Sequence, residues 1–278
     1  AISSIVETLD SHQVSSLITN LVDTMTTRKG DLSVEKKVQN SKLLSNEIQL
    51  FDKDSVLKLS HLLTDTMREQ SESHHHVLND AISATKNFAT VMISEKSEKD
   101  EKVAFLDLLD QVSMRKRSEL KEGEQAQLSM QHLEVVMAKT SAQYPNTSLV
   151  IPQQERGNVL LQVKTSSLST HFSSIDVQGQ ILEHPTETYV TKCDTTLVSP
   201  TISVRFFDPT KHELLPELDN YDFNEPIIAT TIDVSKSMKD DQTGDSFAFV
   251  CKYHVTLNDT WTMDDRVCRT SVSPHDSS

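Results

Sequence analysis

Hydrophobic positions in the first 144 residues recur with the period of an α-helix. In residues 12–25, 52–70 and 105–112 they are spaced three and four apart, so each set lies on one face of a helix. Residues 133–137 show the same spacing, and together the patterns predict five or six helices. The apolar faces comprise Val14, Leu17, Ile18, Leu21, Val22, Met25, Val56, Leu59, Leu63, Met67, Phe105, Leu108, Leu109, Val112, Leu133, Val136 and Met137.

Proline usage supports this prediction. All eight prolines lie at or after Pro145, and proline is excluded from helix interiors because it lacks an N–H and clashes with the preceding turn. Asp54 or Ser55 is available as an N-cap for the helix in residues 52–70. The charged segment 116–127, which contains Gly123, is predicted to be a surface turn or a frayed helix. Breaks between helices are predicted near residues 27–31, 52–54, 71–73 and 94–100.

After Tyr144 the pattern changes to the two-residue period of β-strands. Short alternating segments are separated by turn signals such as Asp208–Pro209, which is typical of an antiparallel β-sandwich. Helices followed by strands, without alternation, predict an α+β fold. We therefore expect a helical subdomain over residues 1–144 and a β-sandwich subdomain over residues 145–278. The predicted strands lie within residues 157–165, 201–208, 226–234 and 246–255.

Residues 249–268, FVCKYHVTLNDTWTMDDRVC, contain two of the three cysteines and the only tryptophan. Cys251 shares one side of its predicted strand with apolar neighbours, and Trp261 and Cys268 follow after a loop. The residues alone leave two explanations open: core packing in a reduced protein, or a direct disulfide between the two cysteines. A zinc site is disfavoured, because the chain has no second C-x-x-C or histidine pair with ligand spacing.

A helical layer followed by a β-sandwich that ends in C-x-Y, a short loop, T-W and a second cysteine resembles the GAIN domain with its terminal GPS motif. That fold occurs in adhesion G-protein-coupled receptors and in polycystin-1-like and egg-jelly-receptor-like proteins. The resemblance in arrangement spans nearly the whole chain, whereas the motif itself covers residues 226–268. The short gap between Cys251 and Trp261 is closer to the polycystin-1 group.

The resemblance implies an extracellular, membrane-proximal domain of a large surface receptor or polycystin-type protein, on the outer side of the plasma or ciliary membrane. In the family, a C-x-C-N-H-L-S/T element follows, and its His and final Ser or Thr perform self-cleavage. This sequence ends at Ser278 before such residues, so we expect an internal piece of a longer protein with no catalytic residue of its own. The implied partners are the downstream C-terminal fragment of the same protein and other surface or extracellular proteins.

The resemblance also implies that Cys251 and Cys268 each pair with one cysteine of that following element, which leaves Cys193 as a lone thiol. The segment before Cys268 departs from the family, because TMDDRV replaces the usual Ser/Gly-rich approach. Two N-glycosylation sequons, at Asn146 and Asn258, favour an extracellular location independently of the motif.

Charge and motif content exclude several classes of function. The net charge of −14 argues against binding to nucleic acid or to an anionic membrane surface. No run approaches eighteen apolar residues, so no direct membrane insertion is expected, and no signal peptide or initiator Met is present. The sequence has no P-loop, G-x-G-x-x-G or G-x-S-x-G motif, and we expect no cofactor and no enzyme activity beyond autoproteolysis.

Two patterns suggest a metal site but are better explained otherwise. Asp233, Ser235 and Ser237 match the D-x-S-x-S motif of metal-dependent adhesion domains, yet too few residues follow to build that fold. Residues 74–76 are three adjacent histidines, which point about a hundred degrees apart on a helix and cannot converge on one ion. The alternatives to the receptor domain are therefore a non-cleaving protein-interaction module and, if Asp233 binds a metal, a metal-dependent adhesion module.

Overall fold

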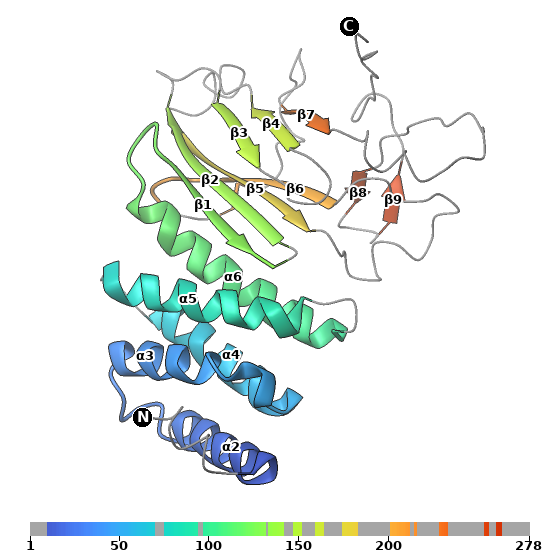
Figure 1. Ribbon diagram of the computed structural model, residues 1–278. Helices are drawn as coiled ribbons and strands as arrows, with labels where there is room; N and C mark the ends of the chain where they lie inside the picture. The colour runs from blue at the N-terminus through green and yellow to red at the C-terminus, as the bar shows by residue number, and fades with distance from the viewer. Residues whose placement is uncertain are drawn as a thin grey trace, which may run out of the picture.

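The computed structural model has an α+β fold, with helices first and antiparallel sheets after them (Figure 1). Within the described residues five α-helices are present: α2 (Ser11–Thr27), α3 (Val34–Ser45), α4 (Lys53–Glu69), α5 (His75–Met92) and α6 (Lys99–Glu119), with a short 3-10 helix η1 (Ile48–Leu50). The predicted fold class is confirmed. The described residues are 10–69, 75–93, 97–131, 133–141, 147–151, 159–163, 174–182, 201–211, 214–215, 228–232, 253–255 and 260–262.

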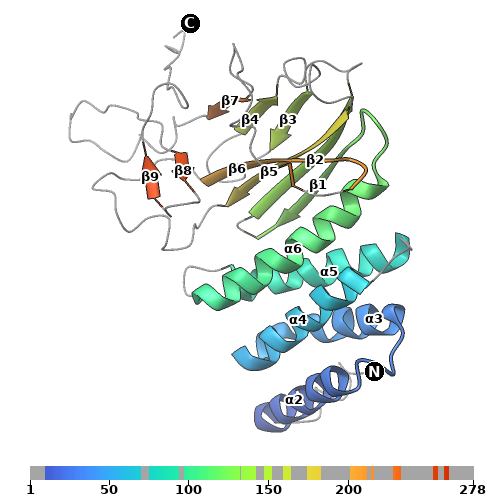
Figure 2. The same cartoon turned by 180° about the vertical axis from the view of Figure 1, so that it is seen from behind.

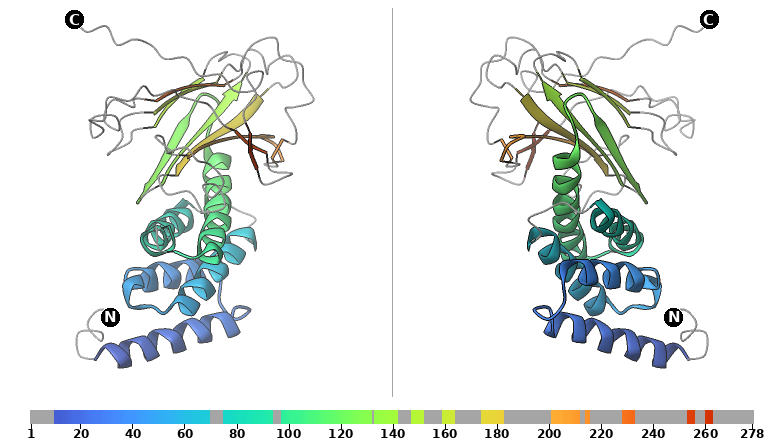
Figure 3. Two further views of the ribbon diagram at one scale, coloured as in Figure 1. Left: turned by 90° about the vertical axis from the view of Figure 1, so that its right-hand side faces the viewer. Right: turned by 90° about the vertical axis from the view of Figure 1, so that its left-hand side faces the viewer.

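The helices form successive layers that end at a sheet (Figures 1 and 2). α2 packs on α4, and α3 packs on both α4 and α5. α6 packs on α4 and α5 and also reaches the sheet, so it connects the helical layers to the strands. Figure 3 shows α2 (blue) at the end of the stack farthest from the sheet, whereas α6 (green) runs up to the sheet.

The helical core consists of the residues that the three- and four-residue spacing selects. Val22, Leu63 and Phe105 are fully buried, and one hydrophobic cluster runs from α2 to the first two strands. Leu17 and Leu21 of the predicted faces are only half-buried, because α2 is the outermost helix. Burial of this apolar surface, at about 25 cal/mol per Å², stabilises the layered arrangement.

Side-chain caps set several helix starts. Asp10 and Gln13 form a reciprocal capping box at α2, with N···O distances of 2.8 and 3.1 Å. At α4 the cap is Asp52, whose Oδ1 accepts the backbone N–H of Ser55 at 2.8 Å. The predicted N-caps Asp54 and Ser55 are therefore wrong: both lie inside the first turn, because the helix already begins at Lys53.

The largest sheet has four antiparallel strands in the order β1 (Gln125–Met130), β2 (Leu133–Ser141), β5 (Ser174–Leu182) and β6 (Thr201–Phe207). A second sheet contains β3 (Thr147–Ile151), β4 (Val159–Val163) and β7 (Ile228–Ile232), and a third contains β8 (Tyr253–Val255) and β9 (Thr260–Thr262). Every pairing between the described strands is antiparallel, as predicted.

The change from helix to strand comes earlier than predicted. α6 ends at Glu119 and the next two elements are strands, so the helical prediction for residues 133–137 is wrong. β2 is buried on both faces: Leu133, Val135 and Met137 join the helical core, while Val136 and Ala138 are buried on the opposite face. A strand buried on both faces is continuously apolar, and such a run also fits a helical period.

The segment between α6 and β1, residues 120–124, is a turn, as one of the two predictions for residues 116–127 has it; residues 116–119 belong to α6 and residues 125–127 to β1. Glu124 N–H donates to the Lys121 carbonyl at 2.9 Å, and Gly123 has a φ of 80°. A positive φ at this position of the turn favours glycine. Gly123 N–H also donates to the Lys139 carbonyl at 2.8 Å, which ties the turn to β2.

Candidate functional site

Polar and charged side chains, buried or half-buried, gather where α6 meets the four-stranded sheet. We call this cluster the α6–sheet joint. Its members are Asp110 and Arg117 of α6, Asp176, Gln178 and Gln180 of β5, and Arg205 and Phe207 of β6. At the joint, charged side chains of α6 contact polar and charged side chains of β5 and β6.

The sequence spacing brings these side chains together. Asp110 and Arg117 are seven residues apart, two helical turns, and therefore lie on one face of α6. Residues 176, 178 and 180 alternate along β5 and share one face of the sheet. The β5–β6 register places Gln178 opposite Arg205 and Asp176 opposite Phe207, so β6 adds its side chains to the same face.

Arg205 joins the sheet to α6 through a bidentate ion pair. Its Nη1 and Nη2 donate to Asp110 Oδ2 and Oδ1 at 2.9 and 2.7 Å. Nη2 also donates to Gln180 Oε1 at 3.1 Å. Two parallel charge-assisted bonds fix the orientation of both partners, which a single contact does not.

Arg117 is the most deeply buried cation of the joint, with 2% of its surface exposed. Its Nη1 donates to Gln178 Oε1, and its guanidinium lies 3.5 Å from the centroid of the Phe207 ring. Burial lowers the pKa of Arg117 to about 10, against the opposing attraction of Asp176 and Asp110. The side chain is therefore still charged at neutral pH, and the aromatic face stabilises that charge where water does not.

Asp176 is fully buried, and neither of its carboxylate oxygens has a hydrogen-bond partner in the described part of the chain. Burial raises the pKa of Asp176 to about 6, although Lys139 and Arg117 act in the opposite direction. Lys139 lies directly opposite Asp176 in the β2–β5 register. A buried carboxylate without hydrogen bonds is unfavourable, which makes Asp176 the least satisfied group of the joint.

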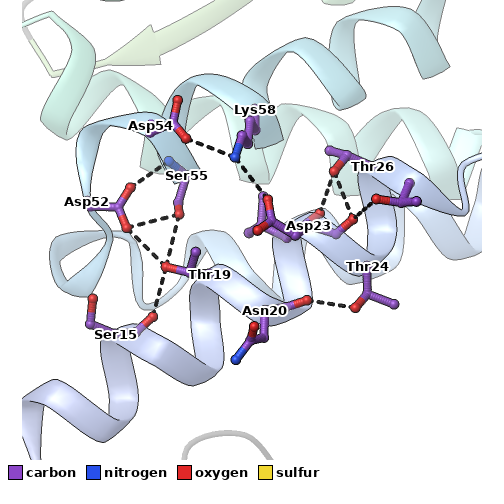
Figure 4. A network of polar contacts seen from close by, with 12 residues as sticks. Ser15, Thr19, Asn20, Asp23, Thr24, Thr26, Asp52, Asp54, Ser55 and Lys58 are labelled. Carbon is purple, nitrogen blue, oxygen red and sulfur yellow. Dashed lines mark hydrogen bonds and ion pairs between the residues drawn. The ribbon is translucent and has the colours of Figure 1, made fainter.

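A second polar cluster joins α2 to the start of α4 (Figure 4), and its charged members are exposed or half-buried. We call it the α2–α4 network; its members are Thr19, Asp23, Asp52, Asp54, Ser55 and Lys58. Thr19 Oγ1 donates to Asp52 Oδ2 at 3.0 Å, next to the cap of α4. Lys58 Nζ lies 2.9 Å from Asp23 and 2.8 Å from Asp54, so it bridges the two helices.

The charges of the α2–α4 network are satisfied by their neighbours. The backbone N–H of Ser55 holds the pKa of Asp52 below its ordinary value, with further help from Thr19 and Ser55 hydroxyls. The hydrogen bonds that Lys58 donates to Asp54 and Asp23 raise the pKa of Lys58. In contrast to the carboxylate of Asp176, the charged forms of Asp52 and Lys58 are favoured by their surroundings.

The structure places few of the residues singled out in the sequence. Trp261 lies in β9, opposite His254 of β8 in an antiparallel hairpin. Five residues lie outside the described ranges: Cys193, Cys251, Cys268 and the sequon residues Asn146 and Asn258. The same holds for Asp233, Ser235 and Ser237, so the disulfide, glycosylation and metal interpretations remain predictions.

His75 and His76 are exposed at the start of α5, as predicted for the histidine run. His75 Nδ1 lies 3.3 Å from Glu119 of α6, whereas His76 Nε2 lies 3.5 Å from Glu35 of α3. The two rings therefore face different helices and do not converge on one ion.

The members of the α6–sheet joint were not predicted from the sequence. In α6 no signal was present either: Arg117 comes five residues after Val112, about 140° around the helix from it, and so lies on the side of Asp110 rather than on the apolar stripe. In β5 the alternation of Asp176 and Gln178 with Ile175 and Val177 is the usual pattern of a strand with one solvent face. Only the position of α6 over that face shows that the polar side chains are buried.

Comparisons with known proteins give little. No family model and no curated protein matches the sequence. Among solved structures, the full extracellular region of zebrafish Gpr126/Adgrg6 is a weak neighbour, with 13% sequence identity and a TM-score of 0.31. The match covers 55% of this chain and 25% of that one, so the chain spans about a quarter of that region. A likeness of this strength does not confirm a GAIN domain and carries no argument about function.

Proposed function

We propose that this chain is a GAIN-like, membrane-proximal domain on the extracellular side of a large surface receptor or polycystin-type protein. Its role is to hold together two parts of a protein that can be self-cleaved, and to relay force or ligand binding towards the membrane. Its partners are then a downstream C-terminal fragment and other surface or extracellular proteins. The chain itself serves as a scaffold and contributes no catalytic residue.

The observation that supports this proposal most is the order of the elements. Helical layers come first, antiparallel sheets follow, and the described strands end in the β8–β9 hairpin that carries Trp261. This is the arrangement that the resemblance through Cys251, Trp261 and Cys268 implies. None of the described helices combines the length and apolarity needed to cross a membrane.

The α6–sheet joint is suited to relaying force. Pull applied to the helical layers reaches the strands through α6, whose Asp110 is held by Arg205 in two hydrogen bonds. Because both bonds must break together, the two layers move as one body under small loads. A domain that only tethered its neighbours would not require such a connection.

Non-reducing peptide mapping by mass spectrometry tests the proposal on the natively purified full-length protein. Each of Cys251 and Cys268 is expected to be bonded to a peptide that lies beyond Ser278. The N-terminus of that downstream peptide then shows whether the backbone has been cut. Two free thiols would overturn the proposal and favour a non-cleaving interaction module, and a direct Cys251–Cys268 bond would overturn the implied pairing.

Surface delivery provides a second test. Trp261→Ala is expected to reduce folding and delivery to the cell surface, because a Trp in the last hairpin contributes about 3–5 kcal/mol when its ring is buried. Trp261→Phe is the matched control, since it keeps an aromatic ring on β9. Normal delivery of Trp261→Ala in a surface-labelling assay would count against the proposal.

A further inference from the structure

The α6–sheet joint contains one buried carboxylate that accepts no hydrogen bond from the described residues. Asp176 has no exposed surface and no hydrogen-bond partner for either oxygen, again within the described residues. Two neighbouring donors, Arg117 Nε and Gln178 Nε2, are also buried without a partner. Among the described residues, only electrostatic attraction to nearby cations stabilises the charged form of Asp176.

The charged groups that face Asp176 come from every element packed against β5. Lys139 lies opposite it on β2, and Arg117 approaches from α6. Asp208, which directly follows β6, opposes both of them. The remaining pair of the joint, Asp110 of α6 and Arg205 of β6, is already matched by its bidentate contact.

We propose that Asp176 is a pH-sensitive switch in the α6–sheet joint: the charged carboxylate weakens the contact between α6 and the sheet, and the protonated carboxyl group strengthens it. The proposal rests on burial and missing partners, because a neutral carboxyl group costs far less than a carboxylate in a site that offers no hydrogen bonds. The switch would regulate the same joint that the proposed function uses to relay force. The pH dependence itself is a property of the folded chain and can be measured whether or not that function is correct.

The direction of the pH effect follows from the raised pKa of Asp176, about 6 in the folded protein. The unfolded chain releases this proton at about pH 4, so the folded state holds the proton more tightly. The stability that the neutral group provides is therefore complete below about pH 4 and is lost as pH rises to about 6. Above that value the joint carries the full penalty of the buried charge.

The test compares Asp176→Asn with the unchanged 278-residue chain by urea unfolding at several pH values. Asn copies the shape of a neutral Asp and does not titrate. The folding equilibrium constant of Asp176→Asn, divided by that of the unchanged chain, is expected to grow from a few-fold near pH 4 to about a hundredfold at pH 7.5. A pKa difference of about two units between the folded and unfolded states implies this ratio. Asp107→Asn is the matched control on α6, since the Asp107 side chain is 57% exposed, and it should show no such growth.

A direct titration keeps the proposal falsifiable if Asp176→Asn does not fold. The side-chain carboxyl carbon of Asp176, followed by NMR in the unchanged chain, is expected to titrate near pH 6. A midpoint near pH 4 would overturn the proposal, as would an Asp176→Asn variant whose stability follows that of the unchanged chain at every pH. Because neither measurement involves the cysteines, failure here is distinct from failure of the proposed receptor role.

Discussion

The α2–α4 network and the α6–sheet joint use the same kinds of side chain in opposite surroundings. In the network, Lys58 bridges two aspartates at the surface, with 40% of its side chain exposed. In the joint, Arg117 and Asp176 are withdrawn from water almost completely. Hydroxyl groups, one backbone N–H and one lysine satisfy the carboxylates of the first cluster. Arg117 depends instead on one amide and one aromatic ring, and Asp176 on neighbouring charges without a hydrogen bond in the described part of the chain.

The comparison shows that the number of charged contacts between two elements does not indicate how much those contacts contribute to stability. An exposed pair gains little, because water competes with each partner and salt screens the attraction. A buried group costs much to desolvate, so removing its partner leaves an uncompensated polar atom inside the protein. Substitutions in the joint should therefore have larger effects than matched substitutions in the network.

The largest effect is expected for Arg117→Ala. The change removes the contact with Phe207, leaves Gln178 Oε1 without its donor and opens a cavity, so the free energy of unfolding should fall by about 3 kcal/mol. Urea unfolding monitored by circular dichroism measures this loss. Arg117→Met keeps an apolar stem and should lose less of the free energy of unfolding than the Ala variant. A loss below about 1 kcal/mol for Arg117→Ala would contradict the importance of the joint.

A smaller effect is expected for the pair Asp110 and Arg205. In a double-mutant cycle with Ala at both positions, the two partly buried hydrogen bonds should give a coupling of about 1.5 kcal/mol. The matched cycle on Asp23 and Lys58 should give a smaller coupling that disappears in about 1 M NaCl. Equal couplings with equal salt dependence would mean that burial does not distinguish the two clusters.

The helices were predictable because each has one apolar face. The stripe from Phe105 to Val112 is fully buried as its spacing indicates, and the helix breaks lie near the predicted positions. β2 was not predictable by period, since it is buried on both faces and loses its alternation. β1 does alternate, with Ala126, Leu128 and Met130 on its inner face, but the sequence interpretation placed these residues before the first strand. The short turn at Gly123 is the local signal that a helix ends there.

The joint was not predictable because its burial is a tertiary property. The side chains of Asp176 and Gln178 alternate as on any half-exposed strand, and no local rule says which face α6 will cover. Arg117 is no exception, since it lies on the side of Asp110 and away from the apolar stripe of α6. The prediction of Trp261 as part of the final β-structure agrees with its place in β9, while the roles of Cys251 and Cys268 are still predictions.

The smallest of the three effects concerns the cap of α4 in the exposed network. Asp52→Ala should lower the free energy of unfolding by about 1 kcal/mol, because the Ser55 N–H loses its acceptor. Asp52→Asn can still cap the helix and should retain most of the stability. Since the cap holds the pKa of Asp52 below its ordinary value, its contribution should be complete above about pH 4 and lost as pH falls further. Thermal melts of both variants from acid to neutral pH test this, and an Asn variant as unstable as the Ala variant would mean that charge, rather than the hydrogen bond, stabilises this end of α4.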